Sequence, residues 1–578
     1  MRLPDKIVAV DTETTGLNPY KHRPLIISYY STKEDCGVFR IDKDVKFDRL
    51  KDPTEMKLFF NAKFDLSMLS KVGIHVRGPI IDISIMYRIL FSDELHYTLK
   101  YLARKFLKEL YLEEVKLKEW LRINKTKVYT NAPDHILYPY ALKDAEVTRK
   151  LLDILIPYLD KNNGWITLRK EMNLMPAVMR MERRGIFIDT EFAEKLKAQA
   201  YHKIGIIMGE IHKLTYPEFN PASNLQLSKM LYPKGGWTHS TKGGKPSVDK
   251  LALLELKSTG NVLADLVMKY RKLVKATNTY IDNVLLAMDS SSIFRVSFNQ
   301  MGACTGRFSS SGYDVKGQIQ NIPRPDKDPD NKRTILGQIR NIFAPAKGYI
   351  IACFDYDQIE MRLRAHFSND TQLIDNINKG ADIHSLTAIR ILGQDKYNED
   401  PVLYRQVFKS MNYAVQYGVG PEKFGLTLFK ETEGKVKLTL EQAATYIGMY
   451  KDTNLPLMEL FNKVEGDVVL TGGVTNPYGR YIPVDITKPY IGVNYLIQST
   501  AADVIKEKML LLDKWNQPGI NMLLQVHDEL VFEIDKDIGK WAFEYIREVM
   551  EEKRFKVPLT VTCSVGKRWG HKKKLQLS

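Results

Sequence analysis

The sequence predicts a multidomain α/β protein, and three observations lead to this prediction. The chain has 578 residues, which is too many for a single hydrophobic core. About the first 160 residues alternate short apolar strand patterns with amphipathic helical patterns, which is typical of an α/β module. Residues 166–290 contain long amphipathic helical patterns, and strand and helix patterns mix again from residue 291.

The composition is that of a globular protein with a basic surface. Apolar residues make up 44% and charged residues 27%, and 85 Lys and Arg against 69 Asp and Glu give a net charge of +16. This excess suits a polyanionic partner such as nucleic acid, although a merely basic protein has the same composition. The four cysteines are isolated (Cys36, Cys304, Cys353 and Cys563). Neither a disulfide framework nor a zinc module is therefore expected, and a reducing compartment fits.

The sequence contains no recognisable targeting or membrane signal. The segment "MRLPDKIVAVDTETTGL" lacks the apolar core of a signal peptide, and no run of 18 apolar residues occurs. A cytosolic protein without membrane attachment is therefore expected.

Acidic residues of the first module have the spacing of a metal site. A strand, "KIVAV", is followed by "DTET", which we interpret as an acidic turn; on a continuing strand, Asp11 and Glu13 would share one face. Asp65 lies in "FFNAKFDLSML", and Asp144 follows Tyr140 by one helical turn. Four carboxylates suit two divalent cations about 4 Å apart, with Tyr140 orienting a water. Any one of these acids alone is more often a solvated surface charge.

A predicted hairpin, "NMLLQVHDELVFEI" (521–534), carries three titratable residues between two apolar strands. We interpret His527, Asp528 and Glu529 as its turn. Their burial is costly unless a metal or a cation pairs with them. A second strand, in "IIACFDYDQIEMRLRAHFSND", ends at Asp355 where a helix begins. The sequence thus predicts two strand-end aspartates.

The segment "RQVFKSMNYAVQYGVG" places Arg405, Lys409 and Tyr413 at intervals of four residues. Each step of four advances about 40° around a helix, so the three side chains form one stripe. Such a stripe is ordinarily a solvated face. In a basic chain with two strand-end aspartates, a triphosphate site is the sharper interpretation, because triphosphate needs both cations and metals.

These segments together resemble a known family. "DYDQIEMR", "RQVFKSMNYAVQYG" and "QVHDEL" are similar to motifs A, B and C of the family A DNA polymerases, the bacterial DNA polymerase I family. Further matches are "TGRFSS", "QIQNIP", "DIHSLTA", "NYLIQSTAADVIK" and "MERRGIFID". Asp11, Glu13, Asp65, Asp144 and Tyr140 resemble the metal-binding set of the DEDD-type 3′-5′ exonucleases. The family's 5′ nuclease domain has no counterpart in this sequence, and this compact form is compatible with a bacteriophage origin.

The resemblance implies a ribonuclease H-like 3′-5′ exonuclease domain followed by a right-hand polymerase domain. The expected exonuclease domain spans 1–165 and the thumb 166–296. The expected palm comprises 297–374 and 486–578, on either side of fingers at 375–485.

The resemblance also implies two Mg²⁺ ions per active site, which Mn²⁺ can replace. Asp355, Asp528 and the carbonyl of Tyr356 are the implied ligands for polymerisation, and the four N-terminal acids are those for excision. Lys409 is implied to protonate the leaving pyrophosphate, and Tyr140 is the implied catalytic tyrosine. The implied dNTP-binding residues are Arg405, Lys409, Tyr413, Glu360, Gln358 and His384. The implied DNA-binding residues are Arg307, Asn494, Gln498, Tyr417, His527, Lys242 and Lys245.

Individual roles follow from the same resemblance. Glu360 would exclude a ribose 2′-hydroxyl beneath Tyr413, which stands where many members have Phe and is associated with acceptance of dideoxynucleotides. Arg307, Asn494 and Gln498 would read minor-groove acceptors near the primer end. His527 and Glu529 would support the primer terminus.

Basic residues of the helical region are candidates for phosphate contacts, although such residues are more often plain surface charges. They are Lys242, Lys245, Lys269, Arg271, Lys272 and Lys275. Asp357 replaces a usual Ser close to the metal ligand, and its charge is expected to affect metal affinity.

The sequence therefore predicts a template-directed DNA polymerase with proofreading, acting in replication or repair on primer-template DNA and dNTPs. A monomer in the cytoplasm of a bacterium or of a phage-infected host is expected, without an obligatory processivity partner. A single-subunit RNA polymerase is an alternative that Glu360 and the exonuclease module disfavour. A catalytically silent DNA-binding factor is another, and the complete carboxylate sets argue against it.

Overall fold

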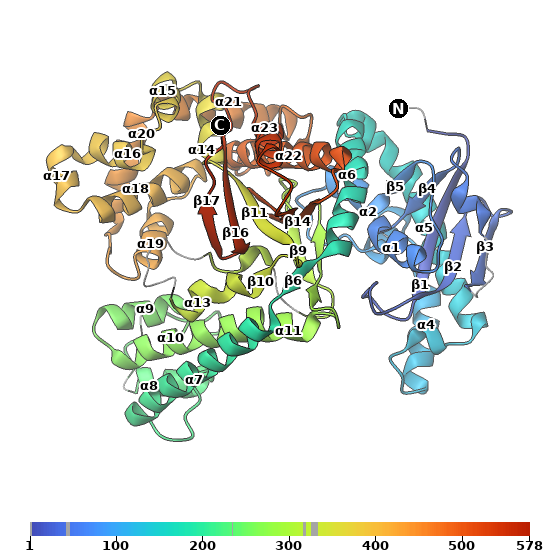
Figure 1. Cartoon of the computed structure of the whole chain (residues 1–578), viewed down its shortest axis with the longest axis horizontal. Helices are drawn as coiled ribbons and strands as arrows, with labels where there is room; N and C mark the ends of the chain where they lie inside the picture. Colours follow the sequence, from blue (N-terminus) through green and yellow to red (C-terminus); the bar gives the residue numbers. More distant parts are fainter. Residues whose placement is uncertain are drawn as a thin grey trace.

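The computed structural model describes residues 3–41, 47–233, 235–237, 239–315, 319–324 and 333–577. An N-terminal module lies beside a larger body whose central sheet is flanked by two groups of helices (Figure 1). The order predicted from the sequence, an α/β module, a helical element and a second mixed module, is confirmed. None of the helices in the described part of the chain is both long and apolar enough to cross a bilayer.

The N-terminal module is built on a five-stranded mixed sheet of order β3-β2-β1-β4-β5. Its strands are β1 (Ile7–Thr14), β2 (Pro24–Tyr30), β3 (Cys36–Arg40), β4 (Met56–Phe59) and β5 (Ile80–Asp82). The central strand β1 pairs antiparallel with β2 and parallel with β4. The interpretation of "DTET" as a turn was wrong, because pairing with β2 extends β1 through Thr14. Asp11 and Glu13 therefore lie on a continuous strand, two residues apart.

Helices cover this sheet and supply the remaining acids. They are η1 (Asp48–Lys51), α1 (Ala62–Lys71), α2 (Ile83–Leu90), α3 (Leu99–Leu102), η2 (Ala103–Leu107), α4 (Leu112–Ile123), η3 (Tyr129–Asn131) and α5 (Asp134–Lys161). The 28-residue α5 packs across β1 and β2. Its buried residues include Leu151, Leu152 and Leu155, which share a hydrophobic core with Ala9 of β1. This apolar contact brings Asp144 of α5 against the acidic strand.

Helices form the following region, and those after α6 reach away from the central sheet (Figure 1). They are α6 (Trp165–Arg184), α7 (Thr190–Leu214), α8 (Asn224–Leu231), α9 (Lys250–Ser258), α10 (Val262–Thr277), η4 (Asn278–Asp282) and α11 (Asn283–Ala287). Asp189, Ser223, Asp249 and Asn261 accept backbone hydrogen bonds as N-caps, which explains where four of these helices begin.

The central sheet of the larger body is antiparallel, in the order β14-β15-β11-β16-β17. Its strands are β11 (Tyr349–Tyr356), β14 (Ile520–Val526), β15 (Glu529–Asp535), β16 (Val561–Arg568) and β17 (His571–Lys574). Val526 pairs with Glu529, so the hairpin turn is His527 and Asp528 alone, with His527 at φ 59°. The expectation that Glu529 belongs to the turn was wrong. It begins β15, opposite Asp355 of β11, and is 1% exposed.

Helices precede and interrupt this sheet. They are α13 (Ile335–Gln338), α14 (Ile359–Ser368), α15 (Thr371–Asn378), α16 (Ile383–Leu392), α17 (Gln394–Glu399), α18 (Pro401–Gln416), α19 (Pro421–Glu431), α20 (Leu440–Thr453), α21 (Leu455–Thr471), α22 (Ile491–Trp515) and α23 (Trp541–Met550). The two short 3-10 helices are η5 (Ile319–Asn321) and η6 (Ile339–Ile342). One continuous hydrophobic core joins many of these helices to the sheet and to α7 and α10, so the larger body folds as a single packed unit.

Small sheets complete the described structure. They are β6 (Ile186–Ile188) between β7 (Ile293–Phe294) and β10 (Phe343–Ala344), β8 (Val296–Asn299) with β9 (Ser309–Gly312), and β12 (Gly473–Thr475) with β13 (Tyr481–Pro483). Two of the expected domain boundaries, 296/297 and 374/375, fall inside β8 and α15. A division at either point would cut hydrogen-bonded structure.

Candidate active sites

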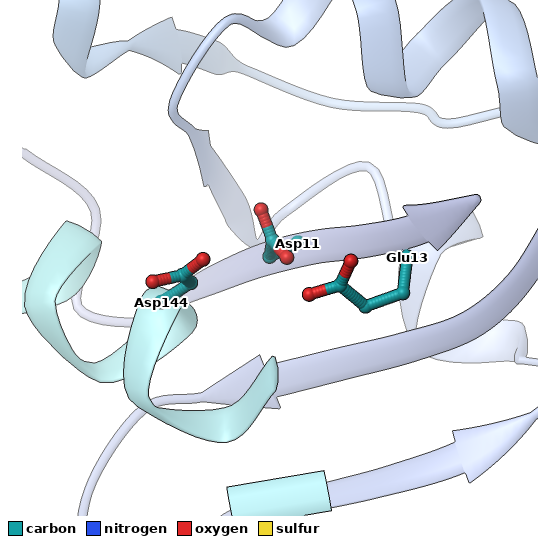
Figure 2. A group of neighbouring side chains, drawn as sticks. All are labelled: Asp11, Glu13 and Asp144. Carbon is teal, nitrogen blue, oxygen red and sulfur yellow. The ribbon is translucent and has the colours of Figure 1, made fainter. Parts of the chain in front are cut away.

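Three carboxylates of the N-terminal module converge on one point. Asp11 and Glu13 project from β1 and Asp144 from α5, and one oxygen of each lies within 4.8 Å of the others. Figure 2 shows the three side chains side by side, two from the strand and one from the helix. The alternation along β1 and the packing of α5 on the sheet together produce this cluster.

The electrostatics of this cluster favour a bound cation. Burial raises the pKa of Asp11 well above its ordinary value, and the charges of Asp144 and Glu13 add to the effect. Burial and Asp144 raise the pKa of Glu13 to about 8, and burial raises the pKa of Asp144 to about 6. Asp144 Oδ1 is buried without a hydrogen-bond partner. The three carboxylates cannot all be ionised without a counter-charge. A divalent metal that prefers oxygen ligands would compensate their charge, so the cluster fits such a metal.

Asp65 and Tyr140 border this cluster. Asp65 lies on α1, is buried, and accepts a hydrogen bond of 2.6 Å from Thr12 Oγ1. It is outside the group of three converging carboxylates, although Asp11 contributes to a raised pKa at Asp65, after burial. The Tyr140 hydroxyl accepts a hydrogen bond of 2.8 Å from Lys100 Nζ. Lys100 was missed from the sequence, because nothing separates it from the many lysines of that helical region.

The second acidic site lies at the end of the central sheet. Burial raises the pKa of Asp355 to about 7, with contributions from Asp528 and Glu529. Burial also raises the pKa of Asp528. The Arg324 guanidinium bridges the two aspartates, with Nη1 3.3 Å from Asp355 Oδ2 and Nη2 3.6 Å from Asp528 Oδ1. Asp355 Oδ1 is buried and has no hydrogen-bond partner, so this site also has oxygen available for a divalent metal.

Arg324 was not indicated by the sequence, although it directly follows the matched segment "QIQNIP". At that position the sequence does not distinguish Arg324 from other arginines in loops. Glu529 has basic neighbours as well: it forms an ion pair with Lys572 of β17 and lies 3.8 Å from Arg340. Burial raises the pKa of Glu529, but Lys572, Cys353 and Arg340 together outweigh this effect and the net shift is downward.

A cavity of about 350 Å³ adjoins Asp528. It brings together residues from four separate segments of the sequence, namely Arg307, Gln358, Glu360, Tyr413, Tyr417, His527 and Asp528. Glu360 forms an ion pair with Arg307 and accepts a hydrogen bond of 2.7 Å from the Tyr417 hydroxyl. Tyr413, the last residue of the stripe on α18, therefore lines the cavity.

The remaining residues of the stripe lie outside that cavity lining. Arg405 Nε forms an ion pair with Asp382 Oδ2 at 2.5 Å, and Lys409 is exposed. His384 is buried, with its ring centroid 6.1 Å from that of Tyr413. Burial lowers the pKa of His384 to about 4, so this imidazole is neutral at neutral pH.

Two predicted DNA contacts lie on α22. The Asn494 side-chain oxygen is buried without a partner, and Gln498 lowers the pKa of the Tyr417 hydroxyl, against the larger effect of burial. Lys242 and Lys245 are exposed in a tight turn, in which Thr241 N donates to Lys245 O at 2.8 Å.

Arg271, a candidate for a phosphate contact, makes hydrogen bonds within the protein. Its guanidinium donates to the carbonyls of Pro221 and Val248, at 3.1 and 2.8 Å, and thus joins two loops. The carboxylate of Asp357 accepts hydrogen bonds of 2.8 Å from the hydroxyls of Thr560 and Thr562, which fix its position near Asp355.

Known proteins resemble both modules. Residues 190–571 match the family described as DNA polymerase family A, and residues 3–160 match a 3′-5′ exonuclease family. The chain is 28% identical to DNA polymerase I of Pseudomonas aeruginosa, with 98% of this chain and 63% of that protein covered. It is 31% identical to the thermostable DNA polymerase I of Thermus filiformis, with 74% of this chain and 51% of that protein covered. The chain thus spans less than two thirds of the length of these relatives.

The fold has a solved counterpart. The polymerase domain of Pol1 from M. smegmatis, in complex with DNA primer-template and dNTP, aligns with a TM-score of 0.81 at 23% identity. The alignment covers 98% of this chain and 96% of that one. The ribonuclease H-like module and the polymerase module are therefore both present, and the family models imply use of divalent metal at their carboxylates. The chain belongs to DNA polymerase family A and carries a 3′-5′ exonuclease domain ahead of its polymerase region.

Proposed function

We propose that this protein extends a DNA primer with dNTPs on a template and removes misincorporated nucleotides from the 3′ end, in replication or repair. The observation that carries the proposal is the presence of two separate carboxylate sites in one chain, at Asp11, Glu13 and Asp144 and at Asp355 and Asp528. The named relatives are DNA polymerases, and the structural counterpart holds primer-template and dNTP.

Asp355 and Asp528 are the proposed metal ligands for polymerisation, with the Tyr356 carbonyl completing the set. Bound divalent cations, which we propose to be Mg²⁺ with Mn²⁺ as a substitute, supply activation of the attacking oxygen and neutralisation of the leaving group. Arg324, which bridges the two aspartates, partly balances their charge in the metal-free protein.

The cavity beside Asp528 is the proposed site for the nucleotide and the primer end. Tyr413 lines it and is the proposed contact to the incoming sugar, with Glu360 excluding a ribose 2′-hydroxyl. Arg405 and Lys409 continue the stripe toward solvent, where a triphosphate can reach them, and Lys409 is the proposed proton donor to pyrophosphate. His384 and Gln358 complete the proposed nucleotide contacts.

The proposed DNA contacts surround the same cavity. Arg307, Tyr417 and His527 line it, and Asn494 and Gln498 project from the adjacent α22. Exposed Lys242 and Lys245 are proposed phosphate contacts, whose contribution is independent of sequence and falls with salt.

For excision, Asp11, Glu13, Asp65 and Asp144 are the proposed metal ligands. Burial raises the pKa of Tyr140, so its hydroxyl keeps its proton. Lys100 fixes that hydroxyl from one side, which leaves it able to orient the attacking water.

The proposed domains follow the sequence, with two boundaries moved to loops. The exonuclease domain is 1–165, the thumb ends at 289–292, and the first part of the palm ends at 369–370. The fingers extend to 485, and 486–578 complete the palm. A cytoplasmic monomer is the proposed form, because the cysteines are unpaired and both sites lie within one chain.

A primer-extension assay with dNTPs or rNTPs tests the proposal. Template-directed extension with dNTPs and little with rNTPs is expected, and Glu360→Ala is expected to admit rNTPs. Extension with rNTPs by the wild type would favour an RNA polymerase. Tight primer-template binding without extension would favour a silent DNA-binding factor.

A further inference from the structure

The loop between β8 and β9 (300–308) ends at the polymerase cavity. It carries Arg307, which lines the cavity and forms an ion pair with Glu360. The loop closes on itself through hydrogen bonds from Gly306 N to Ala303 O at 2.9 Å and from Ala303 N to Arg307 O at 3.1 Å. The position of Arg307 thus depends on how this loop is held.

The exonuclease domain holds the loop at its first turn. Arg88 of α2 donates from Nη2 to the carbonyl of Met301 at 2.8 Å and from Nε to the same oxygen at 3.3 Å. Its Nη1 donates to the carbonyl of Glu94 at 2.8 Å, and its guanidinium carbon lies 4.7 Å from the ring centroid of Tyr97. Arg88 is only 7% exposed. The Arg88 side chain is therefore held in place by its own domain and is hydrogen-bonded to the loop.

The polymerase domain holds the same loop through Arg480. Arg480 Nη1 lies 3.2 Å from Met301 Sδ, and the guanidinium is anchored by Glu171 and Asp503 at 2.6 Å each. Arg480 also lies directly against Gly306, where a Cβ would approach its Cζ to 2.8 Å. Gly306 has φ 79° and precedes Arg307. A shift of Met301 is thus passed through a packed guanidinium to the residue next to Arg307.

We propose that Arg88 is a positioning residue for polymerisation: from the exonuclease domain it fixes Met301, and through Arg480 and Gly306 it sets the position of Arg307. The proposal rests on the proposed function, because Arg307 acts on a primer end only if the protein extends one. Arg88 itself does not line the polymerase cavity. Its loss is therefore expected to weaken the hold on the primer terminus more than the chemical step.

Steady-state extension of a matched primer-template tests this with Arg88→Ala, Arg88→Lys and the exposed control Arg122→Ala. We expect Arg88→Ala to raise the KM for primer-template about tenfold, which corresponds to the loss of one charged hydrogen bond. The kcat should change little. Arg88→Lys, which keeps the charge and one donor, should fall between Arg88→Ala and the wild type. Degradation of single-stranded DNA should remain at the wild-type rate in all three variants.

The double variant Arg88→Ala/Arg307→Ala decides whether the effect passes through Arg307. We expect its KM to equal that of Arg307→Ala alone, since a residue that only positions Arg307 has nothing left to position. If the effects of the two single variants on KM multiply in the double variant, the proposal is overturned. It is also overturned if Arg88→Ala has the same KM as Arg122→Ala. Loss of exonuclease activity in Arg88→Ala would show a merely structural role and would also overturn it. A wild type that extends no primer would overturn the proposed function as well.

Discussion

Each of the two carboxylate sites contains a buried glutamate, and the two glutamates lie in opposite electrostatic surroundings. Glu13 and Glu529 are both buried glutamates beside aspartates, yet burial and Asp144 raise the pKa of Glu13 to about 8, whereas the net shift of Glu529 is downward. The difference lies in the neighbouring bases. Glu529 pairs with Lys572 and lies near Arg340 and Arg324.

The comparison shows two ways to keep a buried glutamate in a folded protein without metal. Glu13 retains a proton, whereas Glu529 keeps its charge beside lysine and arginine. The aspartates of the two sites do not differ in this way, because burial raises the pKa of Asp144 to about 6 and that of Asp355 to about 7. A cation that binds these aspartates displaces their protons, whereas Glu529 depends on its basic neighbours.

Asp528→Ala and Asp11→Ala separate the two sites and have the largest expected effects. On a primer with a mismatched 3′ end, Asp528→Ala should excise but not extend, with extension reduced by about a thousandfold or more, the scale of losing one electrostatic stabiliser of a transition state. Asp11→Ala should retain extension of matched primers and lose excision. Gel analysis of the products measures both. Equal loss of both activities in either variant would contradict two independent sites.

The pH dependence of stability should differ between metal-free and metal-loaded protein. The folded state retains a proton on Glu13 up to about pH 8, whereas the unfolded chain releases it near pH 4.5. The unfolded state therefore binds fewer protons in this window, and stability falls as pH rises through it, by on the order of a few kcal/mol. Thermal unfolding in a chelator should show the midpoint falling between pH 5 and pH 8, and Mg²⁺ or Mn²⁺ should restore it. Glu13→Gln should flatten the metal-free curve, and an unchanged slope would contradict the assignment.

Lys572→Met should destabilise the metal-free protein by about 2 kcal/mol, because it leaves the buried Glu529 carboxylate short of its closest cation. The neighbouring Lys573 is exposed, and Lys573→Met is the matched control with little expected effect. Denaturant unfolding at neutral pH measures both. If the two variants have the same free energy of unfolding, Lys572 does not balance Glu529.

Lys100→Met has the smallest expected effect and is confined to the exonuclease site. It removes the hydrogen bond to Tyr140 and a charge that lowers the pKa of Asp144. We expect excision of single-stranded DNA to slow by about tenfold, as for the loss of one charged hydrogen bond, while primer extension is unchanged. Lys118, which forms an ion pair with Glu114 on α4, provides the control Lys118→Met. Slower extension in Lys100→Met would contradict a local role.

Local patterns in the sequence were sufficient for the acids and for the order of modules. Alternation placed Asp11 and Glu13 on one face, and a spacing of four placed Arg405, Lys409 and Tyr413 on one helix, α18. The errors concerned where elements end. "DTET" continues a strand because β2 pairs with it, and Glu529 begins a strand that pairs with β11, where Asp355 lies opposite Glu529. Such pairing is set by distant residues, so local propensity does not reveal it.

The sequence by itself determined which residue types the sites contain, because periodicity and motif spacing are properties of adjacent residues. Only the tertiary structure decided which bases face those acids. Lys100, Arg324 and Lys572 come from segments in which lysine and arginine are common, and their roles depend on packing between elements far apart in the chain. Arg88 belongs to the same class, since its contact with Met301 spans 213 positions. Charge balance in a buried site is a property of three-dimensional neighbours, so the fold alone could supply it.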